Sequence, residues 1–379
     1  MEHLNQQQPN QLSQQPQKSS NGPIPVNTGR INFWDNLPTP FFALAPMADV
    51  TDAAFRQIVT KYGKPDVLWT EFVSANGLAS PGREALLIDL IFGENERPIV
   101  AQFFTADPEN MYTACVLARE LGFDGIDINM GCPDKSIEKQ GAGAAMMKTP
   151  EQAVEVIRAA KRGAGDLPVS VKTRIGFNTN ELQTWIPLLL AENLAALTIH
   201  ARTRKEMSKV PARWEHVKEV VEMRNKMGVA TKIIGNGDVR DLADAKQKAK
   251  ETGCDGVMIG RAIFGNPFLF SEKEVVGEAR KKSFGFFTRL LILLGLQKPP
   301  KYWHETSSQI PLEKRLTVFV EHAKLFEQLL GGSKSFAIMR KHAKGYVHGF
   351  PGASELRTKI MEANTAGELE LVIRSFLDS

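Results

Sequence analysis

The feature that most constrains the fold is a repeat in which an apolar, strand-like run is followed by a helix-like run. It occurs eight times between residues 41 and 270. Continuous apolar runs such as 98–101 are typical of parallel strands, which are buried on both faces. Eight such units over roughly 240 residues match a (β/α)₈ TIM barrel in count and length. We predict strands at 41–48, 67–72, 98–104, 125–131, 169–176, 196–203, 232–239 and 256–262.

The alternative fold is an open, doubly wound sheet. That fold needs a glycine-rich turn after its first strand, and the residues there are Pro46-Met47-Ala48, so the barrel is favoured. Two helix starts carry recognisable chemistry: Asp107 precedes Pro108, and Thr149 precedes Pro150 in a capping box.

The pattern of the chain changes on both sides of this repeat. Residues 1–30 are rich in Gln, Asn, Pro and Ser and predict a disordered tail. Residues 31–277 form the predicted barrel domain, and 278–308 a basic linker or surface insertion. Residues 309–379 predict a helical bundle. Its helices are expected from Pro311 to Gly331, over 336–347, over 354–363 with Ser354 as a possible N-cap, and after a capping box at Thr365.

Composition excludes several classes of protein. The chain has 379 residues, of which 42% are hydrophobic and 24% charged, enough for a large core and a second domain. A net charge of +4 allows a polyanionic partner without requiring one. Three separated cysteines show neither metal spacing nor a disulfide framework, and no apolar run is long enough to span a membrane. We therefore expect a cytoplasmic protein that uses no metal and no membrane.

In a TIM barrel the active site lies at the carboxyl ends of the strands. There, Cys132 follows an alternating apolar run and stands between Gly131 and Pro133. Its thiol could deliver a proton, or it could be a small buried hydrophobe. This segment alone leaves both interpretations open.

The other predicted strand ends favour the chemical interpretation, because nearly all of them carry polar groups. A core strand has no structural use for a lysine or a histidine. One such residue could be a satisfied buried polar group, but together they predict a polar floor. These residues are Glu71, Gln102, Asn129, Lys172, Arg174, His200, Arg202, Asn236, Asp238 and Arg261.

Two of these ends predict a phosphate site. Loops after strands seven and eight bind phosphate in such barrels, and here they read Asn236-Gly237-Asp238 and Gly260-Arg261. The apolar segment Pro46-Met47-Ala48 and the amide of Gln102 would suit a flat ring with hydrogen-bonding edges. Lys172 beside the ring would stabilise the negative charge of a reduced flavin. We therefore predict an FMN barrel with a cysteine acid.

Seven motifs in this order resemble the tRNA-dihydrouridine synthases. Two more segments, 339–342 and 349–353, resemble the helical tRNA-binding domain of that family, so Arg340 and Lys341 become candidates for tRNA contacts. Two departures are a longer 278–308 segment and Ala201, where the family usually has glycine. The seven motifs span 46–52, 129–133, 141–145, 171–174, 199–204, 235–238 and 258–262.

The resemblance implies a reaction. NADPH would reduce FMN, and the flavin would pass a hydride to C6 of a uracil in tRNA. Cys132 matches the general acid that protonates C5, and Asn129 and Arg174 match residues that hold the base, with Arg202 a further substrate-binding candidate. The matching FMN contacts are Lys172, His200, Asn236, Gly237, Asp238, Gly260 and Arg261.

Two other functions remain open from the sequence. An FMN barrel acting on a free pyrimidine, like a dihydroorotate dehydrogenase, would have no obvious use for the helical bundle. An RNA-binding protein that has lost catalysis would not be expected to keep Cys132, Lys172 and His200. The sequence does not indicate which uridine is reduced.

Overall fold

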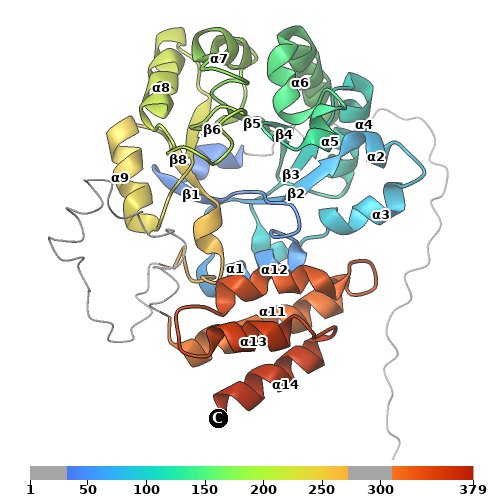
Figure 1. Cartoon of the computed structure of the whole chain (residues 1–379). Helices are drawn as coiled ribbons and strands as arrows, with labels where there is room; N and C mark the ends of the chain where they lie inside the picture. Colours follow the sequence, from blue (N-terminus) through green and yellow to red (C-terminus); the bar gives the residue numbers. More distant parts are fainter. Residues whose placement is uncertain (1–31, 272–309, 379) are drawn as a thin grey trace, which may run out of the picture. The chain divides into compact units, whose positions relative to one another are not determined.

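The computed structural model describes residues 32–271 and 310–378 (Figure 1). The predicted tail at 1–30 and the predicted linker at 278–308 lie outside these ranges, so both remain predictions.

Eight parallel strands form one sheet in the order β1-β8-β7-β6-β5-β4-β3-β2. A parallel bridge between Ala43 and Val67 joins β1 to the start of β2, and the backbone N–H of Asp66 donates to the carbonyl of Phe42 at 2.8 Å. The sheet is thus closed, which confirms the TIM barrel and excludes the open sheet. The strands are β1 (Phe41–Leu44), β2 (Leu68–Ser74), β3 (Ile99–Phe104), β4 (Gly125–Met130), β5 (Val169–Arg174), β6 (Ala196–His200), β7 (Lys232–Asn236) and β8 (Gly256–Ile259).

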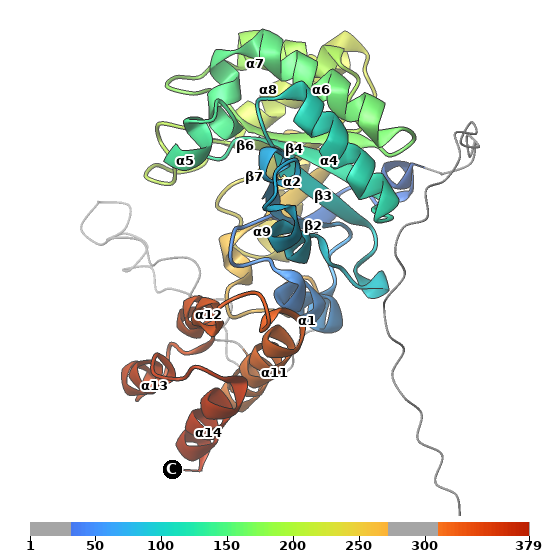
Figure 2. The same ribbon diagram turned by 90° about the vertical axis from the view of Figure 1, so that its right-hand side faces the viewer.

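Helices follow the strands and cover the outside of the barrel (Figures 1 and 2). Asp107 caps α4 by accepting the N–H groups of Glu109 and Asn110, as predicted. Thr149 makes no such bond to α6, so that predicted capping box is wrong; its ψ of 67° departs from the extended backbone that an N-cap needs. The helices are α1 (Ala53–Gly63), α2 (Ala75–Leu78), α3 (Arg83–Leu87), α4 (Pro108–Glu120), α5 (Lys135–Glu138), α6 (Pro150–Ala164), α7 (Leu182–Ala191), α8 (Glu215–Met227) and α9 (Leu242–Thr252).

The two ends of the barrel interior differ in polarity. At the amino end, Trp34 from the short 3₁₀ helix Phe33–Asn36 packs on Phe41 and Trp69, with ring centroids 5.7 and 6.0 Å apart. These side chains belong to an apolar cluster that also contains Val100 and Met258. This end is filled by apolar side chains, whereas buried polar side chains occur from the middle of the barrel, at Asp127 and Ser170, to the carboxyl end.

Four helices form a second core after the barrel: α11 (Leu312–Leu330), α12 (Met339–Tyr346), α13 (Ala353–Ile360) and α14 (Ala366–Leu377). Their apolar side chains pack together with Ala54 and Ile58 of α1, so this core continues onto the barrel (Figure 2). In the described ranges no helix is long and apolar enough to cross a bilayer.

The observed N-caps of these helices agree only in part with those predicted from the sequence. Thr365 caps α14 by accepting the N–H of Glu368 at 3.1 Å, as predicted. Ser354 is not the cap of α13, because Gly352 takes that position in a left-handed conformation that favours glycine, with φ of 80°.

Candidate active site

Cys132 lies just beyond the end of β4, on a turn fixed by side chains. Asn129 Oδ1 accepts the backbone N–H groups of Gly131 at 3.1 Å and Cys132 at 2.9 Å. On the other side, the Ala144 N–H donates to the Cys132 carbonyl, and a Cβ at Gly143 would lie only 2.8 Å from that oxygen. Gly143 has φ of 61°, so glycine satisfies both the backbone conformation and the close approach. The turn therefore holds Cys132 from two directions.

The Cys132 thiol stays protonated near neutral pH. Its side chain is partly buried, and burial raises the pKa of the thiol; the charges of Lys172 and Arg174 act in the opposite direction but do not outweigh burial. A protonated thiol at the carboxyl end of a barrel strand can serve as a proton donor.

A buried chain of hydrogen bonds orients Asn129. Its Nδ2 donates to Gln102 Oε1 at 3.0 Å, and Gln102 Nε2 donates to Asp127 Oδ2 at 2.6 Å. Ser170 Oγ donates to the other oxygen of Asp127 at 2.6 Å. Burial raises the pKa of Asp127 to about 6. The chain fixes both amides and, through Asn129, the Cys132 turn.

Positive side chains gather at the ends of β5 and β6. Burial lowers the pKa of Lys172 to about 8, and the charge of Arg174 adds to that effect. Within residues 32–271 and 310–378, no side chain forms a hydrogen bond or ion pair with the Lys172 ammonium. Burial, followed by the charges of Arg174 and Lys172, also lowers the pKa of His200, so its ring is neutral. Its Nε2 then accepts from Arg202 Nη1 at 3.3 Å.

The two predicted phosphate loops lie side by side. Asp238 Oδ1 accepts from Arg261 Nη2 at 2.7 Å, and Oδ2 accepts from Arg202 Nη2. Asn236 Nδ2 donates to the carbonyl of Met258 in β8 at 2.8 Å. Gly237 has φ of 128°, and a Cβ there would come 2.8 Å from the Cβ of Ala212. Glycine is therefore needed where this loop turns.

This end of the barrel fits an anionic, phosphate-bearing ring cofactor. Among the described residues, Asp238 pairs with Arg202 and Arg261, while Asp127 attracts Lys172 and Glu138 attracts Arg174. Glu138 is itself paired with Arg204, so positive charge is in excess. The β1 loop reaches the same place: a Cβ built at Gly260 would lie 3.8 Å from Met47 Sδ. Pro46 is buried, Met47 is half-buried and Ala48 is exposed.

The structure places two predicted residues elsewhere, on α12. Arg340 Nη2 donates to Asn364 Oδ1 at 2.9 Å, and Lys341 Nζ lies 2.5 Å from Asp49 Oδ2. Both residues remain accessible, so their predicted contacts with tRNA stay predictions. No metal-binding group of three or more His, Cys, Asp or Glu side chains occurs among the described residues.

Comparison with known proteins decides the family. A family profile described as "Dihydrouridine synthase (Dus)" matches residues 43–378. The chain belongs to the dihydrouridine synthase family. It is therefore a flavin oxidoreductase, and the flavin suits the excess positive charge at the carboxyl end of the barrel.

Relatives in this family match nearly the whole chain. A "Probable tRNA-dihydrouridine synthase 2" of Bacillus subtilis is 39% identical over 347 residues, covering 91% of this chain and 96% of its own. A "Probable tRNA-dihydrouridine synthase" of Staphylococcus epidermidis is 38% identical over the same length and coverage.

Solved structures that are similar to part of the chain include a morphinone reductase mutant and a 2-naphthoyl-CoA reductase. Their TM-scores are 0.43 and 0.46, with 14% and 10% identity. The alignments cover 60% and 62% of this chain, and 85% and 52% of theirs.

Sequence reasoning missed two residues of this dihydrouridine synthase site, Asp127 and Ser170. A carboxylate between isoleucines in the run 125–129 was an available signal, because a buried strand rarely carries an unpaired acid. Ser170 carried no signal, because only the pairing of β4 with β5 brings it opposite Asp127.

Proposed function

We propose that the protein reduces the C5–C6 bond of particular uridines in tRNA, with FMN as its flavin and NADPH as the reductant. The observation that carries this proposal is the Cys132 turn, which is held by Asn129 directly opposite Lys172 of the neighbouring strand. Burial raises the pKa of the thiol and so supports its role as a proton donor. The names of the relatives support tRNA as the substrate.

Reduction of the uracil double bond adds a hydride to C6 and a proton to C5. When bound, the flavin supplies the hydride and takes its electrons from NADPH. Cys132 donates the proton from Sγ to C5, and burial keeps that proton available near neutral pH.

The base would be held by groups that the fold leaves available. Arg174 Nε donates to the Gly131 carbonyl at 2.7 Å, and its Nη1 donates to the Thr203 carbonyl at 3.2 Å. Its Nη2 makes no bond to the described residues and can donate to a uracil carbonyl. Asn129 has one Nδ2 hydrogen left after its bond to Gln102. Arg202, bonded to His200 and Asp238, would support the site from behind.

The flavin would be held by residues from six strands, β1, β3, β5, β6, β7 and β8, or from the loops that follow them. Lys172 would stabilise negative charge on the ring, beside Met47 and the neutral His200. Arg261 would exchange part of its bond to Asp238 for the phosphate. The full proposed set is Pro46, Met47, Ala48, Gln102, Lys172, His200, Asn236, Gly237, Asp238, Gly260 and Arg261.

A uridine in folded tRNA must be turned out of its stack to reach this site, at a cost of a few kcal/mol. We propose that the C-terminal helices contact the sugar-phosphate backbone of tRNA and so offset this cost. Arg340 and Lys341 would make some of these contacts.

The test is the reaction itself. Full-length protein is incubated with NADPH and unmodified tRNA, with uridine and orotate in parallel, and the products are identified by mass spectrometry. Dihydrouridine in tRNA, with FMN released from the denatured protein, supports the proposal. Reduction of a free pyrimidine without dihydrouridine in tRNA would favour the dihydroorotate dehydrogenase-like alternative.

A further inference from the structure

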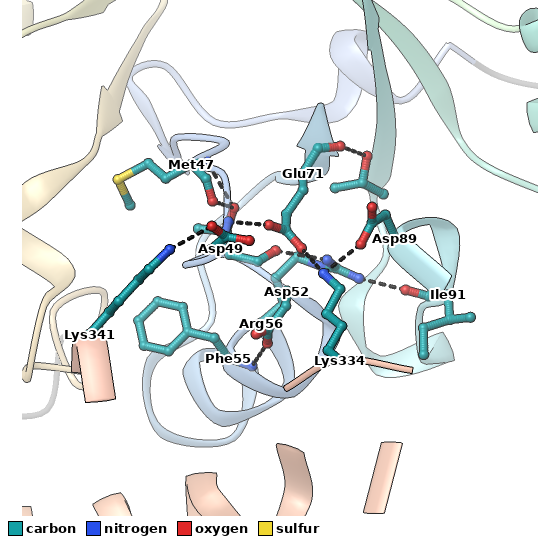
Figure 3. Close-up of polar contacts among 12 residues, drawn as sticks. Met47, Asp49, Asp52, Phe55, Arg56, Glu71, Asp89, Ile91, Lys334 and Lys341 are labelled. Atoms are coloured by element: carbon teal, nitrogen blue, oxygen red, sulfur yellow. Dashed lines mark hydrogen bonds and ion pairs between the residues drawn. The ribbon is translucent and has the colours of Figure 1, made fainter. Parts of the chain in front are cut away.

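A cluster of charged residues joins the C-terminal helices to the loops that follow β1 and β2 (Figure 3). Lys334, between α11 and α12, places Nζ 2.8 Å from Glu71 Oε2 and 2.5 Å from Asp89 Oδ1. Lys341 of α12 pairs with Asp49 at 2.5 Å. The proposed reaction uses none of these acids.

Glu71 is aimed into this cluster by an irregularity in β2. Trp69 lies opposite Val100 and Phe72 opposite Gln102, so two residues of β2 oppose one residue of β3. Such a β-bulge redirects side chains and is common beside active sites. The N–H of Gln102 bonds instead to Thr70 Oγ1 at 3.1 Å, which compensates for the interrupted ladder.

Glu71 connects two parts of the molecule through its two oxygens. Oε2 accepts from Lys334, and Oε1 accepts the backbone N–H of Asp49 (Figure 3). Asp49 follows Met47 and Ala48 in the β1 loop and has φ of 53°, a left-handed conformation that is uncommon outside glycine. The carboxylate therefore holds the loop at the residue whose backbone conformation most needs support.

The two ion pairs differ in burial, and this difference decides which of them contributes to stability. The side chains of Lys341 and Asp49 are 53% and 50% exposed, and exposed pairs contribute little. Those of Lys334 and Glu71 are 13% and 6% exposed. A buried carboxylate that loses its partner is left uncompensated, so Glu71 depends on Lys334.

We propose that Glu71 is a positioning residue for the flavin site: it holds the Asp49 amide and thereby the loop of Met47 and Ala48, while Lys334 from the C-terminal helices holds Glu71. The proposal rests on the proposed function in one respect, that Met47 and Ala48 contact the flavin. The C-terminal helices then support the flavin site as well as the substrate.

The test compares Glu71→Gln with Asp89→Asn. Both change one acceptor of Lys334, but only Glu71 also faces the Asp49 N–H. Because both partners of Glu71 are donors, a glutamine can accept from only one and turns its NH₂ toward the other. Two quantities are measured on full-length protein: hydrogen exchange of the Asp49 amide without flavin, and the Kd for FMN. We expect Glu71→Gln to speed exchange and weaken FMN binding by about 10-fold each, and Asp89→Asn to change neither appreciably.

A second pair covers the case in which Glu71→Gln does not fold, as judged by circular dichroism. Lys334→Met should also speed exchange of the Asp49 amide and weaken FMN binding. Lys341→Met, which removes the exposed pair, should do neither. Unchanged Asp49 exchange in both Glu71→Gln and Lys334→Met would overturn the proposal. Faster exchange with unchanged FMN affinity would also overturn it, because the loop would then not serve the flavin site. Failure of the proposed function is seen separately, as wild-type protein that binds no FMN or makes no dihydrouridine.

Discussion

Two halves of the same barrel end differ in the sign of their charged side chains and in whether those charges are paired. At the ends of β5 to β8 the charges are mostly positive, and Lys172 has no hydrogen-bond or ion-pair partner among the described residues. Near β1 and β2 they are mostly negative, and Lys334 pairs with both Glu71 and Asp89. A charge that is paired within the chain holds the fold together, whereas one left unpaired at a folding cost is available to a ligand.

The largest expected effect is on the chemical step, at Cys132, which follows β4 and borders the positively charged half. Cys132→Ala should slow dihydrouridine formation by about 10²–10⁴-fold, because a general acid is lost. Flavin content and NADPH oxidation should be retained, because the thiol holds neither. Dihydrouridine is quantified by mass spectrometry of tRNA digests. Near-normal turnover would show that Cys132 is not the acid.

The next effect tests the paired half. Lys334→Met should lower the free energy of unfolding by about 2–4 kcal/mol, because it leaves Glu71 and Asp89 without their cation. Lys341→Met removes an exposed ion pair and should change the free energy of unfolding by less than about 1 kcal/mol. Urea denaturation of both variants measures the difference. Equal losses would mean that burial does not distinguish the two pairs.

A smaller effect, opposite in sign, is expected for Lys172→Met. The pKa of Lys172 falls from 10.5 to about 8 on folding. Below pH 8 this half-buried lysine is charged and destabilises the flavin-free protein; this cost decreases as the pH rises from 8 to 10.5. The variant should therefore be more stable than wild type by about 1–3 kcal/mol below pH 8 and no more stable near pH 10.5.

The same variant should bind FMN at least about 10-fold more weakly, because one charge-assisted contact is lost. Thermal unfolding of flavin-free protein across this pH range, together with FMN titration, checks both parts. A variant that is less stable than wild type at pH 7 would contradict the view that Lys172 is kept for a ligand.

The smallest expected effect is that of Arg340→Ala combined with Lys341→Ala, which should weaken tRNA binding and leave the fold unchanged. Each lost phosphate contact should reduce the slope of log affinity for tRNA against log salt by roughly 0.7–0.9. The rate of flavin reduction by NADPH should hardly change. Binding measured at several salt concentrations tests this. An unchanged slope in a well-folded variant would assign these residues to a solvated helix surface.

The apolar pattern located the strands but not where each one ends. Strands predicted at 41–48 and 232–239 begin where β1 (Phe41–Leu44) and β7 (Lys232–Asn236) begin, yet end four and three residues sooner in the structure. Apolar residues mark what is buried, and a loop that folds back over the barrel is buried too. Whether the backbone stays paired depends on the neighbouring strand, which a single segment does not reveal.

By itself, the sequence determined the eightfold barrel, the residue types at its carboxyl end and the presence of a helical bundle, because periodicity and strand-end position are local properties of the chain. Only the tertiary structure decided which of those polar groups have partners. Lys334 and Glu71 are 263 residues apart, and Asp238 lies between arginines from two other strand ends. Lys172 forms no ion pair within residues 32–271 and 310–378. Pairing depends on distances between elements that are remote in the chain, and those distances exist only once the barrel has closed.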